Sequence, residues 1–170
     1  HLLYIVVFFQ ALGSFGQLSK RYLLAKKYDA AINSATSKLK RNPKKAKQAR
    51  VLTLAYKEAM ARDLSDINSY KQDGQPSGWE DIFNICKRIE GRQSKIRPLL
   101  PLYVKKQPAD ITLMDISAEK EYARKKAAAY YYALGMQQSK SGKIATLKQS
   151  EKSFSKVKRY FRNYMDTDNK

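Results

Sequence analysis

The side chains able to do acid–base chemistry in this chain are carboxylates, because its 170 residues include one cysteine and one histidine. Glu80 directly follows Trp79, and burial beside the indole ring would raise the carboxyl pKa, as a helical wall-cleaving enzyme with a single glutamate requires. The neighbouring residues form no motif of such an enzyme, and the helix dipole accounts more simply for a glutamate in the first turn of a helix. We therefore predict a protein without enzymatic activity and keep catalysis at Glu80 as a third hypothesis.

Other catalytic and cofactor-binding arrangements lack the residues that they need. A zinc site or a catalytic triad requires several cysteine or histidine side chains to converge, and the sequence has no phosphate-binding glycine loop or nucleophile elbow. Glu119 and Glu121 lie two positions apart and therefore diverge on a helix. We interpret Cys86 as a small apolar residue on a helix face, and we expect no catalytic residue, metal or cofactor.

A run that interleaves basic and aromatic residues, 156–164, is typical of nucleic-acid surfaces. Helical spacing also makes it an ordinary amphipathic helix. The buried face of this helix would hold Val157, Phe161 and Tyr164. The face toward water would hold three candidate partner-binding residues, Lys158, Arg159 and Arg162.

Charge is distributed unevenly along the chain, whose formal net charge is +19. Residues 17–62 contain 13 basic and 2 acidic side chains, residues 63–116 contain 8 of each, and residues 117–170 contain 13 basic and 5 acidic ones. A uniformly solubilising surface would not concentrate charge at two ends. The pattern favours an acidic or anionic partner, although most single lysines are also expected on the wet faces of helices.

The beginning of the chain is typical of an export signal. Residues 2–9 are an unbroken apolar run that is too short to cross a bilayer comfortably. Small residues, Ser14 and Gly16, stand three and one positions before the expected cleavage point. We therefore predict that residues 1–16 are a cleaved signal peptide and that 17–170 form one domain, located in the periplasm or at the outer-membrane periphery. The alternative is a retained membrane anchor.

Beyond that point the sequence predicts one helix after another, because glycine and proline are scarce and stand at joints. Apolar side chains recur at three- and four-residue spacing in 45–61. They do so again from Ser77, a predicted N-cap, to the stop at Pro98. Prolines favour an irregular path over 99–116, with at most a short strand at 111–113.

Two further helices are predicted in the last third of the chain. Ser117 is the predicted N-cap of the first, and Gly135 allows a neighbouring helix to approach it closely. The second runs from Ile144 toward Tyr164 and presents large apolar side chains on one side. The prediction is an all-α fold of about five to seven helices.

An internal repeat is the most specific pattern in the sequence. Leu-small-x-x-Tyr occupies residues 18–22 and occurs again at 52–56, 34 residues later. Between the two copies, Ala31 and Ala35 supply small packing positions and Pro43 ends the unit. Small side chains let two helices pack closely, and a proline ends one helix while permitting the next to begin.

This arrangement resembles the tetratricopeptide repeat, well over residues 18–75 and loosely over 120–165. Ser19 and Thr53 stand where that family usually has glycine. Together with the export signal, the chain resembles small tetratricopeptide-like envelope proteins of gram-negative bacteria. The resemblance implies a short α-solenoid of antiparallel helix hairpins and a scaffold that binds other proteins.

The leading hypothesis is thus a non-enzymatic adaptor that binds an acidic envelope protein or peptide in a concave groove. Tyr22 and Tyr56 would line or support the groove, beside a positive rim that prefers acidic partners. The rim would consist of Lys44, Lys45, Lys47 and Arg50. The alternative is a basic module that binds an anionic surface, lipid head groups or nucleic acid, through its two charged ends. Export makes nucleic acid the less favoured of these partners.

Overall fold

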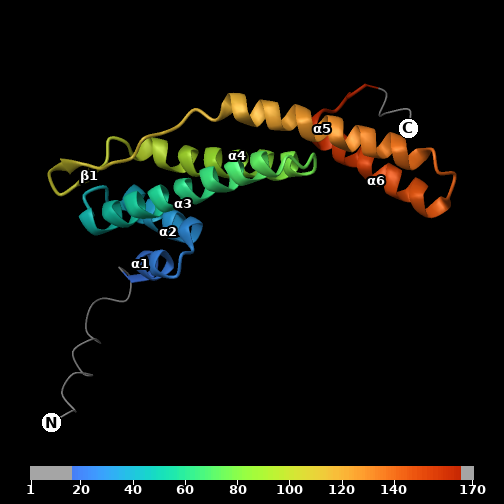
Figure 1. Cartoon of the computed structure of the whole chain (residues 1–170). Helices are drawn as coiled ribbons and strands as arrows, with labels where there is room; N and C mark the ends of the chain where they lie inside the picture. Colours follow the sequence, from blue (N-terminus) through green and yellow to red (C-terminus); the bar gives the residue numbers. More distant parts are fainter. Residues whose placement is uncertain (1–16, 166–170) are drawn as a thin grey trace, which may run out of the picture. The chain divides into compact units, whose positions relative to one another are not determined.

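The computed structural model describes residues 17–165, so the predicted signal peptide lies outside the described residues. Within this range the chain forms six α-helices and one two-stranded antiparallel sheet (Figure 1). The prediction of an all-α fold is confirmed. The helices are α1 (Gln17–Leu24), α2 (Tyr28–Arg41), α3 (Ala46–Asp73), α4 (Gly78–Ile96), α5 (Ser117–Ser139) and α6 (Ile144–Tyr160). In the described range, none of them is long and apolar enough to cross a membrane.

The described residues fall into two compact units, and the division lies within α3 and α4. Unit 1 comprises the described part of His1–Ala61 together with Arg92–Leu113. Unit 2 comprises Arg62–Gly91 and the described part of Met114–Lys170. That 17–170 form a single domain stays a prediction.

The core of unit 1 is built around α2. Apolar side chains recur on this helix at the spacing that brings them to one face, and four of them are fully buried: Ala31, Ile32, Ala35 and Leu39. Two of these are the small packing positions expected from the repeat. From α3, Leu52 and Ala55 are equally buried.

Ser19 stands at one of the positions where the repeat family usually has glycine, and the structure buries it completely. Its Oγ donates a hydrogen bond of 2.7 Å to Gln48 Oε1 and accepts one of 3.0 Å from Lys38 Nζ. Where a glycine would let the helices pack closely, the Ser19 hydroxyl makes hydrogen bonds to α2 and α3. These bonds offset the cost of burying a hydroxyl group.

Helix α3 lies between the predicted joints at Pro43 and Gly74, as expected from the scarcity of glycine and proline. It continues to Asp73, beyond the apolar stripe identified over 45–61. The continuation keeps a helical spacing, because Asp63 and Ile67 are both buried on it. Because Asp63 is charged, the sequence alone does not show that it continues the buried face of the helix. Its burial depends on Arg88 of α4, whose Nη2 donates a hydrogen bond of 2.7 Å to Asp63 Oδ1.

Between α4 and α5, the chain is irregular, as predicted. It forms a 3₁₀ turn, η2 (Arg97–Leu99), followed by the strands β1 (Tyr103–Val104) and β2 (Gln107–Pro108). The short strand expected at 111–113 is absent from the described residues, since the strand pairs lie earlier, with Tyr103 opposite Pro108.

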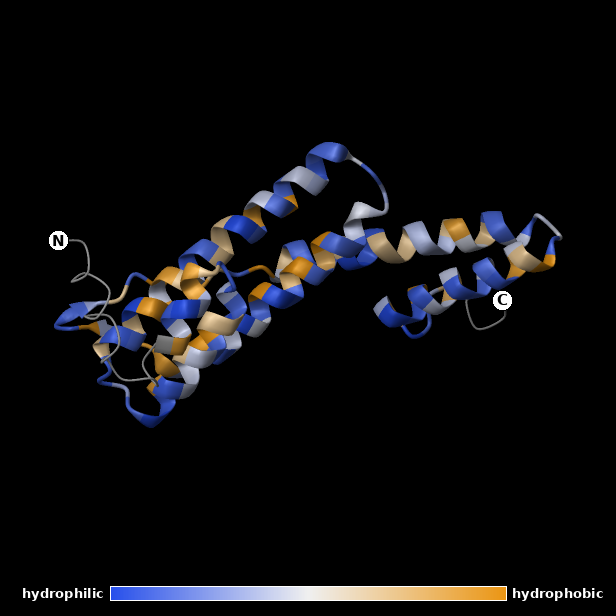
Figure 2. Cartoon of the chain, turned by 90° about the horizontal axis from the view of Figure 1, so that it is seen from below, coloured by the Kyte–Doolittle hydropathy of each residue, from blue (hydrophilic) through white to orange (hydrophobic). Residues whose placement is uncertain are grey.

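Helices α5 and α6 form an antiparallel hairpin in unit 2, and they approach each other closely at Gly135. A Cβ at this position would lie 2.8 Å from the Phe154 ring of α6, and Ser150 Oγ donates a 2.8 Å hydrogen bond to the Gly135 carbonyl oxygen. The predicted close approach at Gly135 is therefore confirmed. Hydrophobic colour in α6 includes its start at the hairpin tip, while most of the helix is hydrophilic (Figure 2).

The N-terminus of α5 differs from the prediction. Ser117 is wrong as the N-cap, because Ile116 occupies the cap position and gives no side-chain capping bond. The cap-like contact comes instead from Asp115, whose Oδ1 accepts a 2.9 Å hydrogen bond from the Ser117 backbone N–H. A carboxylate two residues earlier therefore does what the serine hydroxyl was expected to do.

Candidate functional site

Glu80 lies in the first turn of α4 and contacts side chains from α5 and α6 within unit 2. Its Oε2 accepts hydrogen bonds from the Tyr131 hydroxyl and from Lys156 Nζ, the latter over 2.8 Å. Lys156 Nζ also donates to the Tyr131 hydroxyl oxygen over 2.8 Å and lies 4.3 Å from the centre of its ring. The three side chains join three helices in one polar cluster.

The pKa of Glu80 in this cluster is lowered, whereas a general acid needs a raised one. Partial burial by itself raises the pKa of the Glu80 carboxyl, but hydrogen bonds from Lys156 and Tyr131 outweigh it and leave that pKa below its ordinary value. The hydrogen bond to Glu80 raises the pKa of Lys156. Burial, and then the bond to Glu80, raises the pKa of Tyr131. The raised carboxyl pKa that the enzyme hypothesis needed at Glu80 is not found.

The cluster makes stability depend on pH. Because the folded-state pKa of Glu80 lies below the ordinary 4.5, its carboxylate stabilises the fold fully above that value, and the contribution is lost as the pH falls through the folded-state pKa. We expect Glu80→Gln to lower the free energy of unfolding by about 1 kcal/mol at neutral pH, and the difference from wild type to shrink on acidification. Urea unfolding of both proteins measures it; a difference that stays constant into acid would contradict this assignment.

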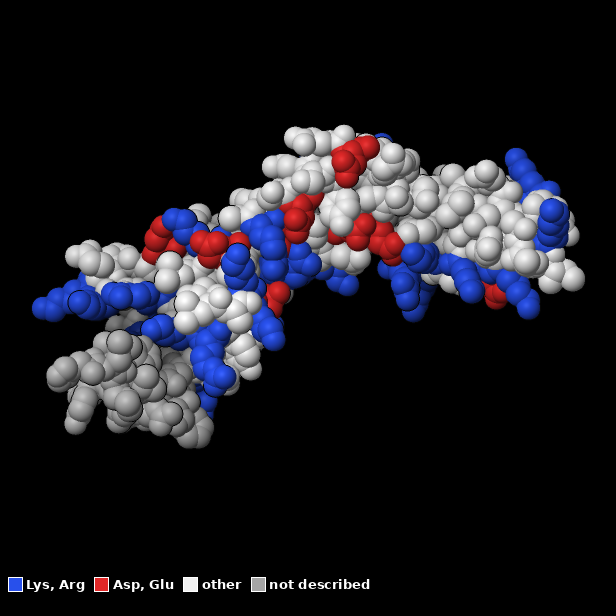
Figure 3. Space-filling model, turned by 60° about the horizontal axis from the view of Figure 1, so that its bottom comes forward, with Lys and Arg blue, Asp and Glu red and all other residues white. Residues whose placement is uncertain are grey.

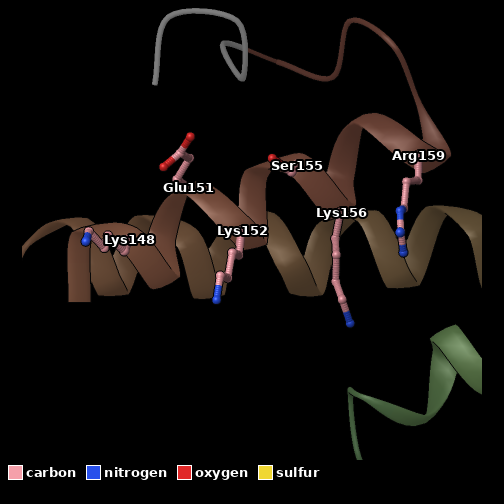
Figure 4. A pocket seen from close by; sticks show the side chains of 6 residues that line it. All are labelled: Lys148, Glu151, Lys152, Ser155, Lys156 and Arg159. Atoms are coloured by element: carbon pink, nitrogen blue, oxygen red, sulfur yellow. The ribbon is translucent and has the colours of Figure 1, made fainter. Parts of the chain in front are cut away.

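Four basic side chains follow one another on the exposed side of α6. We call them the basic row: Lys148, Lys152, Lys156 and Arg159. With Glu151 and Ser155 they line an open hollow of about 580 Å³. Figure 4 shows Lys152, Lys156 and Arg159 extending to the same side, whereas Glu151 points away from them. Spacings of three and four residues produce this alignment, because such positions are neighbours on a helix surface.

Positive charge on the basic row is largely uncompensated. Lys156 has an ion pair with Glu80, whose oxygen lies 2.8 Å away. Among residues 17–165, no ion pair involves the other three members. The sequence from 140 to 162 contains eight basic residues and one acidic residue, and blue side chains gather along one edge of this hairpin (Figure 3). The row thus presents the charges of Lys148, Lys152 and Arg159 to solvent, while Glu80 neutralises Lys156 between the last two.

The three partner-binding residues predicted near the end of α6 do not lie on one surface. Arg159 belongs to the basic row. Lys158 is exposed but lies outside the row, and Arg162 is exposed beyond the end of α6 at Tyr160. Of the side chains expected on the buried face, Val157 is fully buried. Phe161 is half-buried, with the Arg124 guanidinium 4.2 Å from its ring centre.

The residues predicted in the first repeats lie in unit 1. Tyr22 is half-buried on α1. Tyr56 is 4% exposed, and its hydroxyl donates a 3.1 Å hydrogen bond to the Thr112 carbonyl oxygen, so it is a core residue and does not line a surface groove. Burial raises its pKa. The predicted rim is exposed on both sides of the start of α3: Lys44, Lys45, Lys47 and Arg50.

Lys148 and Lys152 are binding candidates that the sequence pattern alone did not single out. The signal was present, since lysines recur every four residues at 148, 152 and 156. Like charges at four-residue intervals lie on one face of a helix. The mixed basic and aromatic run at 156–164 begins at the last of these lysines, so it does not include this spacing.

Cys86 is buried on α4. Burial, and next the charges of Glu119 and Glu90, raise the pKa of its thiol to about 11, so it is a poor nucleophile at neutral pH. In the part of the chain that the structure describes, no three acidic, histidine or cysteine side chains form a group able to hold a metal ion.

No family model, curated protein or solved structure matches the chain. The resemblance to tetratricopeptide repeats therefore stays a prediction from the sequence pattern, and the geometry of unit 2 carries the functional argument.

Proposed function

We propose that this protein is a non-enzymatic binding module that holds an acidic polypeptide segment along the basic row of α6. The observation that carries the proposal is the alignment of four cationic side chains beside an open hollow, three of them without an ion pair among residues 17–165. An acidic segment would supply the carboxylates that these groups lack.

The spacing of the row suits a polypeptide. A helix rises about 1.5 Å per residue, so cations four positions apart stand about 6 Å from one another along α6. An extended chain advances about 3.3 Å per residue and presents every second side chain on the same side, about 6.6 Å apart. Alternating acidic residues of an extended segment therefore meet successive members of the row.

The surroundings of the row favour a polypeptide over single-stranded nucleic acid. Single-stranded nucleic acids gain much of their affinity from bases stacked on exposed aromatic rings. The aromatic side chains of α6 turn inward instead: Phe154 and Tyr160 are buried, and Tyr160 contacts Phe83 with ring centres 5.3 Å apart. Among residues 17–165, those that line the hollow include no aromatic ring.

The helical hairpins support the adaptor aspect of the proposal. Helices α1–α2 and α5–α6 each pair through small or polar residues, Ser19 in the first and Gly135 in the second, as scaffolds of stacked hairpins do. Export to the periplasm and a repeat of the tetratricopeptide type remain part of the proposal. They rest on the sequence pattern, and an envelope protein with an exposed acidic segment is the partner that they imply.

Fluorescence anisotropy with a labelled peptide of alternating glutamate and serine tests the proposal. Exposed charge pairs contribute about 0.5 kcal/mol each, so replacing three of them weakens binding about tenfold. We expect this loss at low ionic strength for the triple variant Lys148→Gln, Lys152→Gln, Arg159→Gln. Affinity should also fall as salt shortens the screening length.

The matched control removes three charges from the other basic end: Lys44→Gln, Lys45→Gln and Lys47→Gln. It leaves the row intact, so its affinity for the peptide should stay within about twofold of wild type. An equal loss in both variants would mean that net charge alone attracts the peptide, and the proposal would fail. Absence of binding by the wild-type protein at low salt would also refute it.

A further inference from the structure

The tip of the α5–α6 hairpin exposes large apolar side chains at the start of α6. Ile144 is 76% exposed and Leu147 is 44% exposed. They lie three positions apart, so they are neighbours on the first turn of the helix. Hydrophobic colour marks this start of α6 at the hairpin tip (Figure 2). Burial of both side chains would be favourable, and within unit 2 they remain in contact with water.

Lysines surround these two apolar residues on the chain. Lys140, Lys143 and Lys148 are all exposed, and no acidic residue occurs between Glu121 and Glu151. Gly142, at φ +69°, makes the tight turn that brings the end of α5 to the start of α6. The tip is therefore a small apolar patch whose charged neighbours from 122 to 150 are all basic, and Glu151, one turn after Leu147, is the first acidic residue beyond it.

We propose that this tip docks on an anionic lipid surface, with Ile144 and Leu147 inserted among the acyl chains and the lysines at the head groups. Apolar side chains beside lysines are the pattern of helices that lie in a membrane interface, where burial and attraction to anionic lipid act together. An acidic peptide without apolar side chains would neutralise the lysines but leave Ile144 and Leu147 in water. The lipid surface is thus the occupant that satisfies both features.

The inference goes beyond the proposed function, because Ile144 and Leu147 lie outside the basic row. One surface would hold the protein at a membrane while the other holds an acidic segment. Lys148 belongs to both features, so the apolar pair separates them by experiment: variants of Ile144 and Leu147 should change binding to vesicles and leave binding to the peptide unchanged.

Co-sedimentation with vesicles tests the tip directly. We expect the protein to bind vesicles of phosphatidylcholine with phosphatidylglycerol and to bind pure phosphatidylcholine weakly. The double variant Ile144→Ser, Leu147→Ser should lower binding to the mixed vesicles about tenfold, while the affinity for the acidic peptide stays unchanged. The matched control is Leu54→Ser, because Leu54 is 45% exposed on α3 and lies in unit 1; it should bind vesicles as wild type does.

An environment-sensitive dye at the tip gives an independent readout. The variant Ile144→Cys can be labelled selectively at neutral pH, because Cys86 is buried with a thiol pKa of about 11. The dye should shift to the blue when mixed vesicles are added, and the same dye on Leu54→Cys should not. Circular dichroism confirms that each variant is folded.

Three results would overturn the proposal. The first is equal vesicle binding by the double serine variant and the wild type. The second is vesicle binding without any spectral shift of the dye at residue 144. The third is a tip variant that loses the acidic peptide instead of the vesicles, which would make the tip a protein contact.

Discussion

Replacing Asp63 by alanine is expected to lower the free energy of unfolding by about 3 kcal/mol, because a fully buried carboxylate group that accepts charge-assisted hydrogen bonds is lost. The Asp63 side chain has 0% exposure, and Arg88 approaches it with two nitrogens, Nη2 at 2.7 Å from Oδ1 and Nε at 3.1 Å from Oδ2. Arg62 adds a longer contact of 3.4 Å to the same carboxylate. Removing the carboxylate leaves a cavity at a fully buried position and takes two hydrogen bonds from the Arg88 guanidinium, whose side chain is 38% exposed.

The matched control for this prediction is Asp66→Ala on the same helix. Asp66 is half-buried, so its loss should change the free energy of unfolding by no more than about 0.5 kcal/mol. Urea unfolding followed by circular dichroism measures both variants. Equal destabilisation by the two substitutions would show that Asp63 contributes only helix propensity or net charge, contrary to its place in the core.

The second large effect is expected at Gly135, where a methyl group has no room. Its Cβ would lie 2.8 Å from Cε1 of Phe154 and 3.0 Å from two further ring atoms, so α6 or the ring must move. We expect Gly135→Ala to lower the free energy of unfolding by about 1–2 kcal/mol, the cost of overpacking less the helix propensity that alanine gains.

Gly91 provides the control, because replacing it by alanine is expected to stabilise the protein. A Cβ at Gly91 meets nothing within 4 Å, although this residue also lies inside a helix. Gly91→Ala should therefore raise the free energy of unfolding by about 0.5–1 kcal/mol. Phe154→Leu should reduce the additional cost of Gly135→Ala in a double-mutant cycle. Stabilisation by Gly135→Ala would refute the close approach of α5 and α6.

The parts of the fold that the sequence predicts well are those set by residue size. Ala31 and Ala35 mark a close helix contact because two helices can approach only where small side chains recur on the facing surface, and both residues are fully buried. Gly135 is predicted for the same reason. Helical spacing of apolar residues likewise predicts α4 from its start after Ser77 to its end before Pro98.

The parts that it misses are those set by polar contacts between distant residues. Asp63 has the character of a surface residue until Arg88, 25 positions later, is placed beside it, so apolar spacing does not predict the continuation of α3. Tyr56 resembles a groove residue until its hydroxyl is seen to donate to Thr112, 56 positions later. Spacing along one helix cannot reveal either partner, because both depend on how separate segments pack.

The candidate site also has a part that the sequence predicts and a part that depends on packing between helices. The basic and aromatic run identifies Arg159, but the row to which it belongs depends on which side of α6 is covered by α5. Burial of Phe154 and Val157 fixes that side, and the lysines at 148 and 152 then face solvent. The enzyme hypothesis required a raised carboxyl pKa at Glu80 beside Trp79, whereas the hydrogen bond from Lys156, 76 positions later, lowers that pKa.

The most direct test of the central claim is a map of backbone amide shifts in the isotope-labelled protein during titration with the acidic peptide. If the basic row holds the peptide, the shifts that change most will be those of residues 148–159, and the triple glutamine variant will lose them. Shifts concentrated instead at residues 44–50, or unchanged throughout the titration at low salt, would contradict the account.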